Sequence, residues 1–126
     1  MNRLSFLCFF ILLYSAMGMT GSDSLNYLHC TYTKDSLVKD FYWTISSNNR
    51  IQRWDDREPT PIKNTLVMNN QKNIVWNEMG NPMGVFVLDK KTMRQSGTLL
   101  SSKNEILDRW VSECIYLEKD QFLNHK

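Results

Sequence analysis

The chain has 126 residues, with 15 Lys and Arg against 13 Asp and Glu, 42% hydrophobic residues and 12% aromatic residues. Its apolar content is too high for a disordered chain. The formal net charge of +2 argues against a nucleic-acid-binding protein, which normally carries a basic stripe and a pI above about 9. At roughly 100–200 residues per domain, the length predicts a single domain.

Residues 1–18 have the pattern of a cleavable signal peptide, with Arg3 followed by an apolar run from Leu4 to Tyr14. The run is shorter than the ~20 residues that a membrane-spanning helix needs. Small residues precede the expected cleavage point after Gly18, and Gly21 is an alternative site; an uncleaved anchor is the less favoured interpretation. We therefore expect a secreted or periplasmic protein whose mature chain does not insert into a membrane.

Two cysteines remain after the leader, because Cys8 lies within it. An even pair in an exported domain indicates a disulfide, so we expect Cys30 and Cys114 to be bonded. A loop of that length stabilises a fold by about 4–5 kcal/mol in the chain-entropy treatment. The alternative is a pair of free thiols. The predicted bridge makes the first and last strands neighbours.

The mature chain begins with a polar stretch, 19–25, which we expect to be a flexible tail. A β-domain is expected over 26–118. Alternating apolar and polar residues from position 26 predict a strand whose two faces carry Cys30 and His29 respectively. A second strand is expected after the turn near residue 35, followed by an Asn-rich turn and a hairpin partner. The remaining strands are expected at 62–68, 72–79, 85–89, 93–100 and 110–117.

Two stretches interrupt this pattern. Two prolines within 55–61 remove ladder donors, so we expect an exposed loop there and no regular strand. Ser102 followed by Glu105 resembles a capping box, so at most one short helical turn is expected near 102–109. Residues 119–126 are expected to be a charged C-terminal tail.

Many short strands joined by turns predict an all-β fold. We expect a single antiparallel meander of seven or eight strands, closed into a small barrel or packed as a sandwich. The terminal disulfide favours the barrel. We expect a monomer or a weak dimer.

Catalytic residues are not apparent in the sequence. His29 is expected on the outer face of its strand, and a lone histidine is more often structural than catalytic. Asp55 and Asp56 are adjacent on a charged loop, a poor arrangement for a glycosidase pair. No metal-ligand cluster or glycine-rich phosphate loop is present, so we expect neither a metal nor another cofactor.

The loop after the third strand carries the candidate binding residues Trp54, Asp55, Asp56 and Arg57. Tryptophan and arginine dominate interface hot spots, so Trp54 next to Arg57 would form a reasonable anchor. The competing interpretation is that Trp54 packs under the loop as a plug for the barrel end. The turn over 78–84 is a second, weaker candidate surface.

A series of short motifs spans most of the mature chain: Cys30, Trp54-Asp55, Ile74-Val75-Trp76-Asn77, Gly84-Val85-Phe86-Val87-Leu88-Asp89-Lys90, Gly97-Thr98-Leu99 and Cys114. This pattern resembles the small exported β-domains of bacterial periplasms. By size and architecture it is similar to the periplasmic C-type lysozyme inhibitors, small barrels that insert a loop carrying Ser and Lys into the lysozyme cleft. Ser96-Gly97-Thr98 lies in a comparable place, without the full SxSGxxY-type signature, so no inhibitor residue is transferred.

These observations favour a non-enzymatic exported protein that binds a protein or a cell-envelope component through its end loops. The alternatives are a lysozyme inhibitor and a small envelope hydrolase that uses Asp55 or Asp56.

Overall fold

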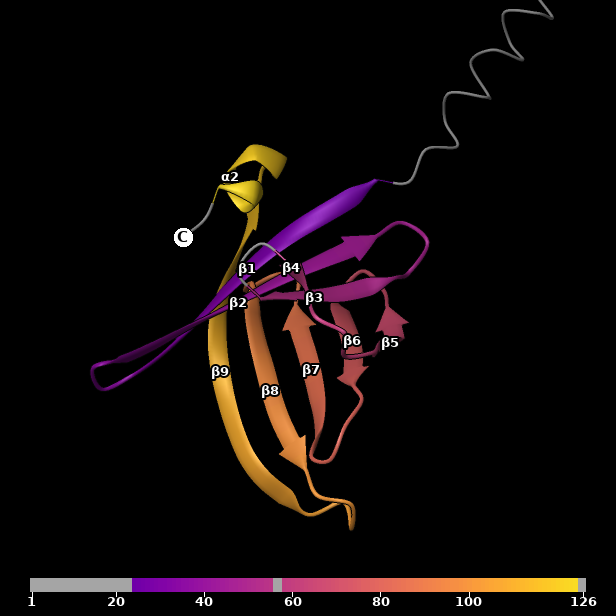
Figure 1. The fold of residues 1–126 in the computed structure, drawn as a ribbon, viewed down its shortest axis with the longest axis vertical. Helices are drawn as coiled ribbons and strands as arrows, with labels where there is room; N and C mark the ends of the chain where they lie inside the picture. Colours follow the sequence, from indigo (N-terminus) through magenta and orange to yellow (C-terminus); the bar gives the residue numbers. More distant parts are fainter. Residues whose placement is uncertain (1–23, 56–57, 125–126) are drawn as a thin grey trace, which may run out of the picture.

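The computed structural model describes residues 24–55 and 58–124, and the predicted signal peptide, Asp56 and Arg57 lie outside this range. The described chain forms nine antiparallel strands in one sheet and one short helix (Figure 1). The elements are β1 (Leu25–Lys34), β2 (Leu37–Ser46), β3 (Ile51–Asp55), β4 (Glu58–Pro59), β5 (Asn64–Asn69), β6 (Asn73–Glu78), β7 (Met83–Asp89), β8 (Arg94–Leu100), β9 (Ile106–Leu117) and α2 (Lys119–Leu123).

The strand order is β4-β3-β2-β1-β9-β8-β7-β6-β5. Each strand therefore pairs with its neighbour in sequence, except that β1 and β9 pair with each other and β4 does not pair with β5. This confirms the predicted all-β antiparallel meander. The described residues hold more strands than the expected seven or eight because a two-residue strand, β4, lies in the proline-containing stretch.

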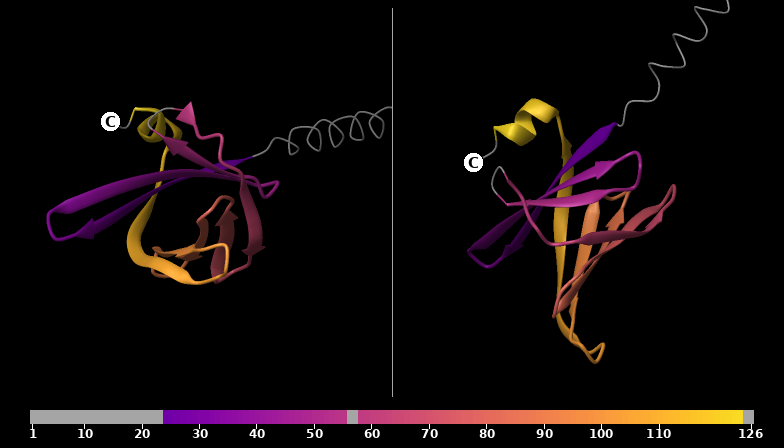
Figure 2. Two further views of the ribbon diagram at one scale, coloured as in Figure 1. Left: turned by 60° about the horizontal axis from the view of Figure 1, so that its bottom comes forward. Right: turned by 45° about the vertical axis from the view of Figure 1, so that its right-hand side comes forward.

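The sheet curls into a half-barrel without forming a continuous ladder around its circumference (Figure 2, left). The terminal strands pair, as the disulfide predicted, and the sheet opens elsewhere. Its two edges are β4 and β5, which are joined by the segment with the second proline. The opening falls here because proline supplies no backbone N–H for a ladder.

The core fills the inner face of the curled sheet. Trp43, Trp76 and Phe86 are almost fully buried at its centre, and their rings lie 4.9–5.6 Å apart between centroids. Such aromatic contacts add about 0.5–1.5 kcal/mol per pair beyond the burial of apolar area. The other buried apolar core residues are Leu28, Cys30, Ile45, Ile51, Ile74, Leu88 and Cys114.

Cys30 and Cys114 form the predicted disulfide between β1 and β9. The two residues are direct partners in the β1–β9 ladder, and both are buried in the core. The bond therefore crosslinks the first and last strands in sequence, which are neighbours in the middle of the sheet.

The sequence predicts no regular strand in the proline-containing stretch, but part of this stretch does pair with β3. Trp54 and Asp55 pair with Pro59 and Glu58, and the amide of Thr60 donates to the carbonyl of Arg53 at 2.9 Å. Pro59 is tolerated because β4 is an edge strand, where a missing donor breaks no ladder bond on the outer side.

The single helix of the described chain lies after β9, and no helical turn forms at 102–109. Ser101, one residue before the expected cap, accepts hydrogen bonds from the amides of Lys103 and Glu105. The resulting tight turn lets β9 begin at Ile106, opposite Leu100. The segment expected to be part of a charged tail instead forms α2, whose Phe122 is 1% exposed.

Candidate functional site

The predicted binding anchor, Trp54, is engaged in packing on the outer face of the sheet. Its indole Nε1 donates to the hydroxyl of Thr44 at 2.9 Å, and its ring meets Phe122 edge-on at 5.5 Å. Asp55 is exposed at the end of β3. Among the described residues, Trp54 therefore packs against Phe122 of helix α2, and Asp56 and Arg57 of the adjacent loop lie outside the described range.

Phe122 anchors α2 in an aromatic cluster on this outer face. Besides Trp54, its ring contacts Tyr27 at 4.9 Å and Tyr42 at 6.0 Å between centroids. Burial, together with the negative charge of Asp40, raises the pKa of Tyr42 above its ordinary value. The phenol therefore stays neutral at physiological pH, as packing against the apolar rings requires. This cluster is a second, smaller core outside the half-barrel.

His29 lies on the outer face, as its register predicted, in a polar group with Asp40 and Thr31. Its Nε2 lies 2.8 Å from Asp40 Oδ1 and 3.3 Å from Thr31 Oγ1, and its ring stacks on Tyr42 at 4.5 Å. A catalytic histidine contacts the nucleophile and the orienting carboxylate through opposite nitrogens. Here one nitrogen faces both partners, so this geometry is not that of a catalytic triad.

The other sequence candidates are spread over the strands. Ser96, Gly97 and Thr98 lie in the middle of β8, paired on both sides, and not in a loop. Met79, in the 78–84 turn, is 50% exposed, whereas Glu78, at the start of that turn, lies on the inner face of β6. Among the described candidates, Trp54 and Asp55 lie on β3, whereas Met79 follows the end of β6.

A different site lies at one end of the inner face. We name the cavity there the mouth pocket; it has a volume of about 240 Å³. Four aromatic side chains, four charged side chains and one leucine line it, drawn from seven strands. They are Tyr32, Lys39, Phe41, Arg53, Glu78, Phe86, Leu99, Asp108 and Trp110.

The aromatic wall of the mouth pocket continues the core outward. Trp110 stacks near Phe41 at 6.4 Å and meets Phe86 edge-on at 6.0 Å. The Arg53 guanidinium lies over the Phe41 ring, 5.7 Å from its centroid, close enough for a cation–π contact. The wall therefore offers both an apolar surface and a fixed positive charge.

Charged groups complete the lining. Arg53 and Glu78 form an ion pair with Nη1 and Oε1 2.6 Å apart, and the Glu78 side chain is only 12% exposed. Within the described part of the chain, Glu78 Oε2 and Trp110 Nε1 are buried without a hydrogen-bond partner. A buried polar atom without a partner costs about 1–3 kcal/mol. Both atoms belong to residues that line the pocket, so a ligand there could supply their hydrogen bonds.

Gly97 makes the position of Trp110 possible. It faces Trp110 in the β8–β9 ladder, and a methyl group built on its Cα would overlap the indole ring. The indole therefore lies flat against the backbone of β8. A residue with a side chain at this position would push the ring out of the pocket wall.

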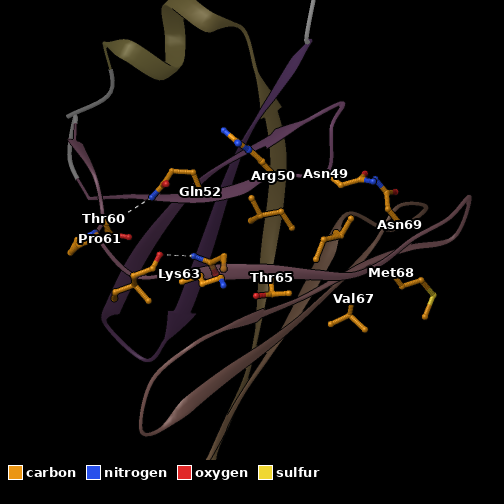
Figure 3. A pocket seen from close by; sticks show the side chains of 14 residues that line it. Asn49, Arg50, Gln52, Thr60, Pro61, Lys63, Thr65, Val67, Met68 and Asn69 are labelled. Atoms are coloured by element: carbon orange, nitrogen blue, oxygen red, sulfur yellow. Dashed lines mark hydrogen bonds between the residues drawn. The ribbon is translucent and has the colours of Figure 1, made fainter.

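A larger groove, of about 970 Å³, lies between β3 and β5 (Figure 3). It is shallower, and none of the described residues that line it is aromatic or acidic. Local hydrogen bonds already occupy part of its wall: the Gln52 amide donates to the carbonyl of Thr60 at 2.8 Å, and Asn64 donates to the carbonyl of Ile62 at 3.4 Å. The groove therefore offers fewer specific contacts than the mouth pocket.

Among residues 24–55 and 58–124, no group of three or more His, Cys, Asp or Glu side chains could hold a metal ion. Over the same residues, no helix has the length and apolar character to span a membrane. No protein-family model, curated protein or solved structure matches this chain. The candidate site therefore depends on geometry alone.

The mouth pocket is absent from the sequence predictions, although the alternation of residues along the strands carries a signal for it. Arg53 follows the core residue Ile51 by two positions, Glu78 follows Trp76, and Asp108 precedes Trp110. Residues two apart on a strand share a face, so each charge is directed toward the inner side. Charged residues at inward-facing positions of several strands indicate a place where the apolar core gives way to a polar pocket.

Proposed function

We propose that this protein is a non-enzymatic, exported binding protein and that the mouth pocket is its binding site. One observation carries the proposal: four charged side chains surround an aromatic wall at inward-facing positions, where a purely structural core would be apolar. Ligand sites are typically apolar cavities with a few convergent polar groups, and this pocket has that composition.

The size of the pocket indicates the kind of ligand. At about 240 Å³ it lies below the roughly 300–1,000 Å³ typical of sites for drug-sized molecules. A single side chain or a group of similar size fits it better than a whole metabolite. We therefore infer a macromolecular partner, held by an anchor group in the mouth pocket.

Export is supported by two features. The Cys30–Cys114 disulfide is typical of oxidising compartments, and residues 1–18 have the pattern of a signal peptide. The partner is accordingly expected outside the cytoplasm, in an envelope or an extracellular fluid.

The test is affinity capture from an envelope extract with the oxidised protein, followed by binding measurements with the purified partner. A Trp110→Leu, Asp108→Asn variant changes the mouth pocket, and a Trp54→Ala, Arg57→Ala variant changes the loop predicted from sequence. We expect the pocket variant to weaken binding at least about tenfold, or about 1.4 kcal/mol, and the loop variant to bind normally. The reverse pattern would assign binding to the loop.

A direct assay tests lysozyme as a partner, because the sequence resembles small periplasmic inhibitors. A stoichiometric excess of protein at micromolar concentration should slow lysozyme if that resemblance extends to function. If lysozyme activity is unchanged, the inhibitor hypothesis fails and the general binding proposal stands.

A further inference from the structure

The mouth pocket opens to the outside where two strands separate. β1 and β9 pair only from Tyr27 opposite Leu117 to Thr31 opposite Glu113. Beyond this point the β1–β2 hairpin projects away from β9 (Figure 1). Within the described residues, one side of β9 over 106–112 therefore has no strand partner. We name this side of β9 the free edge.

Backbone groups on the free edge point toward the side from which β1 has separated. The amide of Cys114 donates to the carbonyl of Met93 on the β8 side, and in antiparallel pairs the bonding direction alternates along the strand. Arg109 and Val111 therefore direct their backbone N–H and C=O groups away from β8. The 4.0 Å separation between the Cα atoms of Cys30 and Cys114 agrees, because short separations mark pairs that exchange no backbone bonds.

The free edge and the mouth pocket form one continuous surface. Asp108 and Trp110 line the pocket from β9, next in sequence to Arg109 and Val111, and Lys39 lines it from the projecting hairpin. The Arg109 N–H already donates to the Asp108 carboxylate at 2.8 Å, so an added strand would replace that bond, whereas no described strand pairs with the outer side of Val111. Side chains of a strand added along the free edge would alternate between the outside and the inner face. Every second side chain of such a strand would point toward the pocket.

We propose that β9 binds an extended segment of another polypeptide as an added strand, with one apolar or aromatic side chain of that segment in the mouth pocket. This rests on the proposed function and names its partner. Strand addition combines main-chain hydrogen bonds with side-chain pockets at alternate positions, and both features lie side by side here. The aromatic wall selects the anchor, while Lys39 and Asp108 provide charges of both signs for its neighbours.

The place where the β1–β2 hairpin separates from β9 favours a single extended segment over a second copy of this chain. Pairing of two copies through their free edges would require each sheet to approach the other side by side. The projecting β1–β2 hairpin flanks the free edge (Figure 2), so that a second curled sheet would meet the hairpin. An extended segment brings no second sheet with it, so it can pair with β9 alone.

The test uses synthetic peptides about as long as the free edge, with alternating Thr and Val and a central Tyr, and the oxidised protein expressed from the full chain. Binding is measured by fluorescence anisotropy. N-methylation of the alternate amides that face β9 should weaken binding at least about tenfold, whereas N-methylation of the other set should not. Replacing the central Tyr with Ala should also weaken binding.

Matched protein variants test the same edge. Val111→Pro removes an N–H group that points away from β8, and proline is tolerated on an edge with this orientation. We expect this variant to fold normally, as judged by circular dichroism, and to lose peptide binding. Val111→Thr keeps the N–H group and should bind normally.

The outcomes separate the two proposals. In one outcome, binding depends on Trp110 and yet is unaffected by Val111→Pro and by both N-methylated peptide sets. That result would support the mouth pocket as the binding site and reject strand addition. Strand addition would likewise be rejected if the captured partner needs Trp110 for binding but the peptides do not bind. A concentration-dependent dimer that Val111→Pro dissolves would show that a second copy occupies the edge, and would overturn the proposal.

Discussion

At the scale of single residues, the close contact between Gly97 and Trp110 carries a testable consequence. Gly97→Val would place a side chain where the indole lies, so Trp110 must leave the pocket wall. We expect a loss of stability of about 1–3 kcal/mol, the usual cost of overpacking, and a loss of partner binding. Denaturant unfolding and a binding assay measure the two effects.

Ile74→Val is the control, since Ile74 is buried in the core and does not line the mouth pocket. It lowers stability by about 0.5–1.5 kcal/mol without displacing Trp110. Equal losses of binding in the two variants would mean that general destabilisation, and not the position of Trp110, controls binding.

Asp89 provides a second prediction at this scale. Its carboxylate accepts hydrogen bonds from the amides of Lys91 at 2.8 Å and Thr92 at 3.1 Å, and these bonds lower its pKa below the ordinary value. Because the folded pKa is the lower one, the stabilisation is full above the unfolded pKa of about 3.9 and is lost as pH falls through the folded value.

We therefore expect Asp89→Ala to lower the thermal midpoint at neutral pH, with a difference from the wild type that shrinks in acid. Asp89→Asn keeps an acceptor oxygen without the charge, so its difference from the wild type should be smaller at neutral pH, and it should also shrink in acid because the titrating carboxylate belongs to the wild type. Calorimetry from pH 7 to about pH 2 tests this. A difference that is constant over the whole range would contradict the turn assignment.

Among the features of single residues, the turn residues were the easiest to predict from the sequence. Asn49 has a φ of 66°, in agreement with the Asn-rich turn inferred from sequence, because asparagine tolerates the left-handed region. The inward charges Arg53, Glu78 and Asp108 were predictable in principle from alternation. Their convergence was not, because it depends on the register between strands and on the curvature of the sheet.

At the scale of elements, helix α2 depends on one side chain. Phe122→Ala removes the ring that contacts Tyr27, Tyr42 and Trp54. We expect a loss of about 3 kcal/mol in the free energy of unfolding, at the low end for a buried phenylalanine because the helix is terminal. Leu123→Ala, at a position 46% exposed, should cost far less. Urea denaturation would compare them, and similar costs would contradict the docking of α2.

The same element shows where local sequence signals fail. Ser102 and Glu105 resemble a helix start, yet strand pairing from Ile106 onward outweighs that local preference. Helix α2 has only five residues, too few for stability in isolation, so no window of the sequence could predict it. It forms because Phe122 finds aromatic partners on β1, β2 and β3, which only the folded sheet brings together.

At the scale of the whole molecule, the disulfide joins the first and last strands in sequence, β1 and β9. A Cys30→Ser, Cys114→Ser variant, or the reduced protein, should lose about 2–5 kcal/mol in the free energy of unfolding, as usual for a small exported domain. Thermal unfolding with and without reductant measures this. Equal midpoints in the two conditions would contradict a stabilising bridge.

The sequence by itself determined the all-β class, the antiparallel meander, the disulfide pairing and the faces of the strands. These follow from period-two alternation, turn residues and cysteine number, all of which are local or arithmetic properties. Tertiary structure alone decided where the sheet opens, which segment covers Trp54, and that charged side chains from separate strands meet in the mouth pocket. Those outcomes depend on sheet curvature and on the point where β1 leaves β9, which are set by contacts between residues far apart in the chain.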